Sequence, residues 1–322
     1  MIGKIPAHVL EINKIFYEKG YMSYLVGGCV RDLLSERKMK DWDFTTNATP
    51  EEILKLFPDA FYDNKFGTVG IPIKNLEETE HEGVIEVTTF RNETAYINRR
   101  HPENVTWGKT VEEDLSRRDF TINAMAMELI TSNSEFKIID PFGGQEDLKN
   151  KTIRAVGDPN LRFKEDALRL MRAIRFATQL SFSIDEKTLQ AIMHDAPLLT
   201  EISSERIRDE FLKILASEYP SEGVILLKNT NLLQYILPEL LEGIGMSQER
   251  PGRHHKTDVF THNVMALKFC TSKDPIVRFA TLIHDVAKPY VAGLDEEGYV
   301  IFHNHEIIGA KIGREIADRL RF

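Results

Sequence analysis

The chain changes character near residue 145, and this change limits its possible folds more than any other feature of the sequence. Before that point, FGTVGIPI and VIEVTTF have the β-branched content that is typical of strands, and YMSYLV reads as a buried strand that ends at a glycine pair. Beyond it, apolar residues recur at helical spacing in RFKEDALRLMRAIRFATQL, SSERIRDEFLKILAS, THNVMALKFC and VRFATLIHDVAK. The turn-forming stretch IIDPFGGQEDL separates the two parts. The pattern predicts an α+β protein with a mixed first region and a helical remainder.

Length and cysteine content narrow the class of protein further. A chain of 322 residues is expected to fold into two or more packed units. Only two cysteines are present, Cys29 and Cys270, which favours a reducing compartment over a disulfide-stapled secreted protein. The first residues lack the order of a signal peptide, and no apolar run approaches the roughly 20 residues that span a bilayer. A soluble, cytoplasmic protein is therefore expected.

Two capping patterns predict where helices of the first region begin. Thr49, Pro50 and Glu52 have the spacing of a capping box with proline at the first helical position. Thr110 and Glu113 have the same spacing. We expect the second pattern to open one or two helices that run through RRDFTINAMAMEL.

The stretch LVGGCVRDLLSERKMKDWDF places two carboxylates around a tryptophan. In a strand, Asp41 and Asp43 would point to one face while Trp42 packs on the other. Paired carboxylates suit Mg²⁺, which binds oxygen ligands and substrate phosphates. Glu86, an acidic residue in the strand VIEVTTF, is the candidate third ligand of a two-metal site for phosphoryl transfer, unless it only pairs with a lysine.

The glycine pair in the same stretch predicts a phosphate site. Gly27 and Gly28 would let a phosphate approach the backbone, and the predicted helix CVRDLL would direct free N–H groups at it. Arg31 adds a bidentate donor. The Gly-Lys-Ser/Thr ending of a Walker loop is absent. A glycine pair alone is usually a turn and Asp-x-Asp is often a solvated edge, but their combination favours a nucleoside triphosphate site.

A basic window, residues 153–176, lies within this acidic chain of net charge -9; it holds six Arg or Lys and three Asp or Glu. In EDALRLMRAIR, Asp166 and Arg169 are three apart on a predicted helix, and Arg172 and Arg175 continue nearly along that face. A salt-bridged surface helix would give the same pattern. An acceptor beside a donor also suits the base edges of cytosine and adenine and mismatches guanine and uracil.

Five ordered blocks, VGGCVRDLL…KDWDFTTNATPEEI, VIEVTTFR, RRDFTINAMA, DPFGGQEDL and RFKEDALRLMRAIRFA, resemble class II tRNA nucleotidyltransferases (the CCA-adding enzymes) and bacterial poly(A) polymerases. The resemblance implies a polymerase-β-like nucleotidyltransferase head (1–145), a helical neck (146–200), a helical body (201–250) and an HD-type helical region (251–322). It implies that Asp41 and Asp43 hold catalytic Mg²⁺. The residues implied to contact the nucleotide are Gly27, Gly28, Arg31, Arg118, Asp119, Asn123, Asp166, Arg169, Arg172 and Arg175.

The C-terminal segments HHKTDVFTHNV, LIHDVAKP and FHNHEIIGA resemble the metal-binding segments of HD domains. The residues carried over are His262, His284, Asp285 and His305, with His255 and His303 as weaker candidates and Asp318 as the candidate closing aspartate. Imidazole ligands suit a divalent transition metal. Alternatively, these histidines are core or interface groups.

The function implied by the resemblance is template-independent addition of C and A to the 3′ end of tRNA, with CTP, ATP and two Mg²⁺ ions. Residues 91–120 resemble a flexible loop that relatives adding only CC tend to lack. An A-only enzyme (a terminal-A adder or a poly(A) polymerase), an HD-domain phosphohydrolase and a noncatalytic RNA binder are the alternatives. The chain stops at IADRLRF, where longer relatives continue into a tail that contacts the tRNA elbow, so a truncated C-terminal region is an open alternative.

Overall fold

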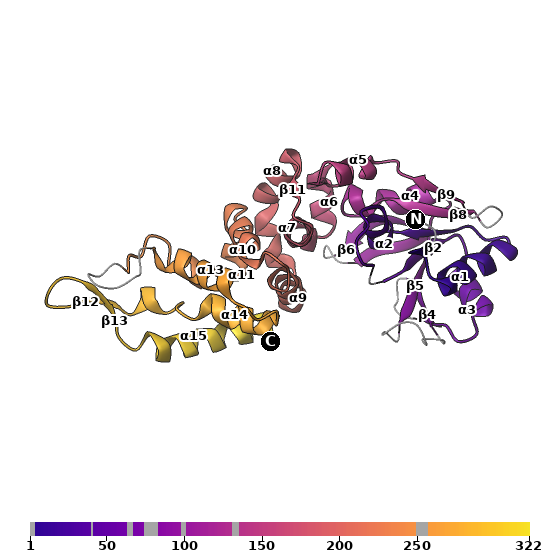
Figure 1. Cartoon of the computed structure of the whole chain (residues 1–322). Helices are drawn as coiled ribbons and strands as arrows, with labels where there is room; N and C mark the ends of the chain where they lie inside the picture. Colours follow the sequence, from indigo (N-terminus) through magenta and orange to yellow (C-terminus); the bar gives the residue numbers. More distant parts are fainter. Residues whose placement is uncertain are drawn as a thin grey trace. The chain divides into compact units, whose positions relative to one another are not determined.

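The computed structural model describes residues 4–39, 41–62, 67–73, 83–97, 101–130, 135–248 and 257–322 (Figure 1). The chain forms two compact units, Met1–Glu165 and Asp166–Phe322. Within the described ranges, no helix combines the length and the apolar content needed to cross a bilayer.

The N-terminal unit is built on a seven-stranded sheet with the order β3-β4-β5-β2-β1-β8-β9. Strands β2 and β5 run parallel, and the other neighbours run antiparallel. The strands of this sheet are β1 (Ser23–Val26), β2 (Asp43–Thr46), β3 (Phe61–Tyr62), β4 (Thr68–Pro72), β5 (Val84–Thr89), β8 (Ala126–Ile130) and β9 (Glu135–Ile139). A separate hairpin pairs β6 (Arg91–Ile97) with β7 (His101–Trp107), and β10 (Thr152–Ile153) is short. The three strands expected from the sequence are thus confirmed as β1, β4 and β5.

Both faces of the sheet are covered. Leu25 and Phe44 point into a core shared with α1, α2 and α3, whereas Tyr24 and Val26 point into a second core shared with α4. This alternation follows from the two-residue period of a strand. The helices of this unit are α1 (Ala7–Glu18), α2 (Gly28–Leu34), α3 (Pro50–Leu56), α4 (Val111–Ser116), α5 (Gly144–Lys149) and α6 (Pro159–Glu165), with a 3₁₀ turn η2 (Thr121–Asn123).

The two capping patterns have different outcomes. Thr49 and Glu52 form the complete reciprocal box at the start of α3. Thr110 accepts from the Glu113 backbone N–H, but the Glu113 carboxylate accepts from the Lys109 N–H at 2.7 Å instead of closing the box.

The expectation of helix through RRDFTINAMAMEL was wrong beyond α4. The chain makes the η2 turn and then the strand β8, which pairs with β1 and with β9. Alanine and methionine are among the strongest helix formers, but intrinsic propensity is a small effect that tertiary context can override. Pairing on both sides and complete burial of Ala126 and Met127 outweigh that preference.

The C-terminal unit is mainly helical, as predicted. Its helices are α7 (Leu168–Leu180), α8 (Glu186–Asp195), α9 (Ser204–Leu215), α10 (Pro220–Asn229), α11 (Leu233–Ile236), α12 (Pro238–Leu241), α13 (Val259–Phe269), α14 (Pro275–Ile283) and α15 (His305–Leu320), with 3₁₀ turns η3 (Ala196–Glu201) and η4 (Lys288–Tyr290). The hairpin of β12 (Ala292–Leu294) and β13 (Val300–Phe302) was not foreseen, nor was the short β11 (Ser183–Ile184). The fold class predicted from the sequence is confirmed.

Candidate active site and candidate metal centre

Two carboxylates meet across the parallel strand pair of the N-terminal unit. Asp43, the first residue of β2, is the register partner of Glu86 in β5. Because Phe44 points into the core with α1 to α3, Asp43 and Glu86 share the opposite face, where α4 packs. The sequence had suggested that Asp41 lies in the same strand as Asp43. It instead precedes β2, and its side chain is exposed.

The electrostatics of Asp43 reveal the groups around it. The pKa of Asp43 is raised to about 6: burial is the largest cause, the negative charges of Glu86 and Asp41 add to it, and the guanidinium of Arg118 opposes the shift. Negative charge thus accumulates at the start of β2 with incomplete compensation. A divalent cation bound to these carboxylates would relieve it, so the residues present fit the predicted metal site.

The turn between β1 and α2 depends on the absence of a side chain. Gly27 has φ 74°, a value that favours glycine, and a Cβ there would lie 2.8 Å from Nη1 of Arg118. Arg118 follows α4, and its Nη2 donates to Asp114 Oδ2 at 3.0 Å. The predicted phosphate-binding turn, which includes Gly28, therefore lies against Arg118, one of the residues predicted to contact the nucleotide.

A buried polar network joins α2 to the η2 turn. Arg31 Nη1 donates to Asn123 Oδ1 at 2.7 Å, and the other side of its guanidinium pairs with Asp32. Asn123 Nδ2 donates to Asp119 Oδ1 at 3.3 Å, and that oxygen also accepts from the Phe120 N–H. The predicted nucleotide ligands of this unit thus lie on contiguous elements, although contact with a nucleotide stays a prediction.

The predicted base-reading residues lie at the start of the C-terminal unit. Asp166 precedes α7 and is not on the helix, because α6 ends at Glu165 and α7 begins at Leu168. Its Oδ1 accepts from the Leu168 N–H at 3.1 Å, and its Oδ2 accepts from Arg206 Nη2 at 2.7 Å. Each carboxylate oxygen has two lone pairs, so both can still accept a bond from a base amine.

The arginines along α7 differ in their surroundings. Arg169 and Arg172 are half-buried. Arg175 is only 8% exposed, donates to Glu210 Oε1 on α9 at 2.9 Å and stacks over the Phe176 ring. Its visible role is to join α7 to α9, and the predicted contact with a nucleotide is untested.

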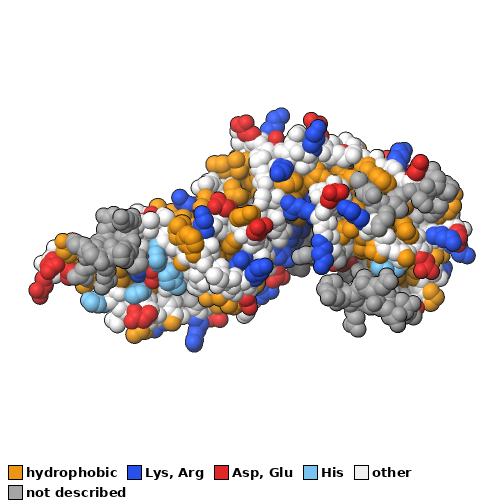
Figure 2. All heavy atoms as spheres, viewed as in Figure 1, with side chains coloured by type: hydrophobic (Ala, Val, Ile, Leu, Met, Phe, Trp, Pro, Cys, Tyr) orange, Lys and Arg blue, Asp and Glu red, His pale blue; other side chains and the backbone are white. Residues whose placement is uncertain are grey.

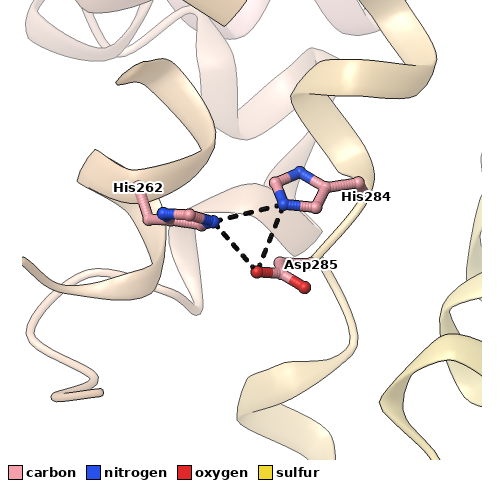
Figure 3. A group of neighbouring side chains, drawn as sticks. All are labelled: His262, His284 and Asp285. Atoms are coloured by element: carbon pink, nitrogen blue, oxygen red, sulfur yellow. Dashed lines mark hydrogen bonds and ion pairs between the residues drawn. The ribbon is translucent and has the colours of Figure 1, made fainter. Parts of the chain in front are cut away.

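The histidines of the C-terminal unit converge on one aspartate (Figure 3). His262 Nε2 from α13 lies 3.2 Å from His284 Nε2 and 3.2 Å from Asp285 Oδ2. Among the described residues, this trio is the one group of His, Cys, Asp or Glu whose ligand atoms all lie within 4.8 Å of one another. The three head carboxylates, Asp41, Asp43 and Glu86, therefore do not all lie within that distance of one another. Figure 2 shows histidine side chains on the visible surface of this unit.

His305 at the start of α15 completes the cluster, with its Nε2 3.5 Å from Asp285 Oδ1. His284 and His305 place Nδ1 at 2.9 and 2.7 Å from the backbone carbonyls of Thr281 and Phe302. This geometry makes Nδ1–H the donor and leaves the Nε2 lone pairs for a metal, so the donor set fits a transition metal.

Asp285 forms an ion pair with Lys288. Lys288 Nζ lies 2.6 Å from Asp285 Oδ2 and donates to Gln248 Oε1 at 2.6 Å. Burial alone would raise the pKa of Asp285, but the bonds from His284 and Lys288 outweigh it and lower that pKa. The bond with Asp285 raises the pKa of His284.

The other HD candidates do not join this cluster. Asp318 is 13 residues beyond His305 on α15, roughly 20 Å at the rise of an α-helix, and is exposed. It is therefore not the closing ligand. His303 is exposed in the turn before α15. His255 lies outside the described residues.

Three family models match successive parts of the chain. They are described as the poly A polymerase head domain (residues 23–154), the probable RNA and SrmB-binding site of polymerase A (residues 181–243) and the HD domain (residues 260–322).

Solved and curated relatives agree with these models. The crystal structure of the Bacillus stearothermophilus CCA-adding enzyme in complex with CTP is 32% identical with a TM-score of 0.65; the match covers 97% of this chain and 68% of that one. The chain belongs to the family of CCA-adding enzymes. The curated CCA-adding enzymes of Geobacillus sp. (strain WCH70) and Enterococcus faecalis are 47% and 44% identical over 70% and 78% of this chain.

CCA-adding enzymes are nucleotidyltransferases, and the head and HD domains imply dependence on a divalent metal. The matches cover 54% and 58% of the two curated relatives, so the chain spans about half the length of the curated relatives it matches.

Two residues that contact predicted site residues of this member of the CCA-adding enzyme family were not identified in the sequence analysis. Asp114 was detectable, because it lies three and four residues before Arg117 and Arg118 on a predicted helix. Arg206 was not, because it contacts Asp166 from 40 residues away.

Proposed function

We propose that this chain catalyses template-independent addition of C and A to the 3′ end of tRNA, using CTP and ATP. The observation that carries the proposal is the combination of paired carboxylates on β2 and β5 with a glycine turn and an arginine. It occurs in a chain 32% identical to a CCA-adding enzyme solved with CTP. The proposal includes two Mg²⁺ ions and a cytoplasmic location. The location is supported by the two cysteines, which are both free thiols, as is usual in a reducing compartment.

The head residues have separate roles in this proposal. Asp41, Asp43 and Glu86 hold the metal, and bound Mg²⁺ would polarise the α-phosphate and make the terminal hydroxyl more acidic. Gly27 and Gly28 let the triphosphate approach the backbone, because no Cβ blocks it.

The remaining residues position and select the nucleotide. Arg31 and Arg118 supply cationic donors to the triphosphate, while Asp119 and Asn123 contact the nucleotide sugar or phosphates. Asp166 accepts from the exocyclic amine of C or A, and Arg169 donates to the unprotonated ring nitrogen. Guanine and uracil would leave these groups unpaired, which is the basis of selection. Arg172 and Arg175 are kept as candidate contacts.

The proposal keeps the ranges expected from the sequence for the functional parts: head 1–145, neck 146–200, body 201–250 and HD region 251–322. Helices of the body are proposed to contact tRNA phosphates. Such contacts release counterions, so tRNA binding should weaken as salt rises.

Stepwise extension tests the proposal. Transcripts ending before CCA, after C and after CC are incubated with CTP or ATP alone and with Mg²⁺. Addition of C to the first two and of A to the third is expected. Addition of A alone, never C, would identify the A-only alternative. Asp43→Ala should abolish all addition.

A second activity is favoured by the histidine cluster. We propose that His262, His284, Asp285 and His305 bind a divalent transition metal and support phosphohydrolase chemistry. The support is the convergence of imidazole nitrogens on a buried aspartate with side chains partly open to solvent. Phosphate release from nucleoside phosphates by wild type and Asp43→Ala, but not by His284→Ala, would support it. Loss in Asp43→Ala would assign that activity to the head.

A further inference from the structure

Asp114 is a completely buried carboxylate with no role in the chemistry described so far. It lies on α4 with 0% of its surface exposed. Its Oδ1 accepts from Nε and Nη2 of Arg117 at 3.0 and 2.6 Å, and its Oδ2 accepts from Nη2 of Arg118 at 3.0 Å. Burial alone would raise the pKa of Asp114, but the two arginines outweigh it and lower the pKa. Asp114 is therefore ionised near neutral pH.

Of the two arginines, Arg118 lies against the glycine turn. Arg118 Nη1 lies 2.8 Å from the position that a Cβ on Gly27 would occupy, and the Arg118 charge acts on Asp43. Its Nε is buried and has no hydrogen-bond partner within the described ranges. A buried donor without a partner costs free energy unless a ligand satisfies it. Asp114 thus fixes one edge of the Arg118 guanidinium, while Nη1 lies against the Gly27 turn.

We propose that Asp114 is a positioning residue, which holds Arg118 against the Gly27 turn so that its remaining N–H groups meet the triphosphate of the incoming nucleotide. The inference rests on the proposed nucleotidyltransferase function. Arg118 has a long flexible side chain, and an arginine fixed in advance loses less entropy when it binds a phosphate. The buried ion pair supplies that fixation, because a buried carboxylate needs a cation beside it.

The proposal makes a base-independent prediction. Asp114→Asn keeps the shape but removes the charge that orients Arg118. We expect kcat/KM to fall about 10- to 100-fold, the range expected when a positioning contact is lost. The loss should be the same within about twofold for CTP and ATP, because the triphosphate is common to both. The Ki of inorganic tripolyphosphate should rise by a similar factor.

Arg117 provides the matched control, since Arg117→Lys alters the same carboxylate's other partner. It should leave kcat/KM and the tripolyphosphate Ki within about twofold of wild type. Arg118→Lys should reproduce the Asp114→Asn loss, and the double variant Asp114→Asn/Arg118→Lys should lose little more, as expected for two residues in one interaction network.

Stability is measured in parallel by thermal unfolding. If Asp114→Asn does not fold, Asp114→Glu retains the charge but displaces the carboxylate by one methylene, and it should show the same change in tripolyphosphate Ki. A lowered melting temperature with an unchanged Ki would make Asp114 a residue of the fold alone and overturn the proposal. Calorimetric binding of tripolyphosphate tests the role of Asp114 separately from the proposed function. A wild type that binds tripolyphosphate but adds no nucleotide would contradict the proposed function. The affinities of wild type and Asp114→Asn for tripolyphosphate would still decide whether Asp114 positions Arg118.

Discussion

At the scale of single residues, the ionised carboxylate of Asp43 lowers the stability of the metal-free protein. Its carboxylate is largely removed from water across the strand register from Glu86, whose side chain is exposed, and Arg118 compensates only part of the negative charge. A folded-state pKa of about 6 lies above the ordinary value of 3.8. The folded protein therefore holds the Asp43 proton more tightly than the unfolded chain does. The free energy of unfolding must then decrease as pH rises from about 4 to about 6, and it stays lower above that range.

Replacing Asp43 by Asn should therefore stabilise the metal-free protein. The variant has no carboxylate to ionise, so in EDTA at pH 8 its free energy of unfolding should exceed that of wild type by about 1 to 3 kcal/mol. At pH 3, where the carboxyl is protonated in both states, the gain should vanish. Urea unfolding at both pH values measures it.

Glu11→Gln, which removes an exposed carboxylate of the same unit, serves as the control and should change little at either pH. An equal gain for Asp43→Asn at pH 3 and pH 8 would contradict the assignment of a raised pKa. Added Mg²⁺ should stabilise wild type more than the variant.

At the scale of secondary-structure elements, α7 and α9 are joined by a buried ion pair. Arg175 and Glu210 are 8% and 3% exposed, and their contact is 2.9 Å. Lys213 also reaches the Glu210 carboxylate, at 3.2 Å, but from a side chain that is 53% exposed. Removing one partner of a buried pair leaves an uncompensated charge, whereas replacing both by apolar residues is often neutral.

Glu210→Leu alone should destabilise the protein by about 3 to 5 kcal/mol, and Arg175→Met/Glu210→Leu should recover most of that loss. Chemical unfolding compares the two. Lys213→Met is the control and should cost less than about 1 kcal/mol, as an exposed partner does. A double variant as unstable as Glu210→Leu would show that the pair does more than neutralise charge.

The same double variant tests the predicted nucleotide contact of Arg175. Once chemical unfolding shows the double variant to be folded, its KM for CTP and ATP reports on the loss of the Arg175 guanidinium. An unchanged KM would limit Arg175 to joining α7 and α9. A rise of about tenfold or more, which corresponds to 1.4 kcal/mol of binding, would establish the contact.

Local sequence patterns predicted these elements well where one segment determined the structure. The capping box of Thr49 and Glu52 is complete within four residues, and the strand containing Glu86 is evident from its β-branched neighbours. The pairing of Asp43 with Glu86 and of Asp166 with Arg206 spans 43 and 40 residues, so it depends on the sheet register and on helix packing. The conformation of β8 was predicted wrongly for the same reason, because pairing with its two neighbouring strands decides it.

At the scale of the whole molecule, the two units hold different kinds of site. The N-terminal unit offers carboxylates, a bare glycine turn and arginines, which suit Mg²⁺ and phosphate. The C-terminal unit offers imidazole nitrogens around Asp285, which suit a transition metal. Ligands for the two sites should therefore stabilise different elements.

Hydrogen exchange should resolve the two effects in the intact chain. CTP with Mg²⁺ is expected to slow exchange in β2 and β5, while Ni²⁺ at low concentration slows exchange in α13, α14 and the start of α15. A ligand at 100 times its Kd stabilises the state that binds it by about 2.7 kcal/mol. Amides that exchange only when the ligand-bound structure opens should therefore exchange roughly 100-fold more slowly. His262→Ala/His284→Ala should abolish the Ni²⁺ effect and preserve the CTP effect, because the histidine pair belongs only to the second site. Protection of β2 and β5 by Ni²⁺ that persists in this double variant would mean that Ni²⁺ binds the head carboxylates. Absence of any Ni²⁺ protection in α13 and α14 of the wild type would instead leave the histidine cluster as a hydrogen-bonded group of the fold.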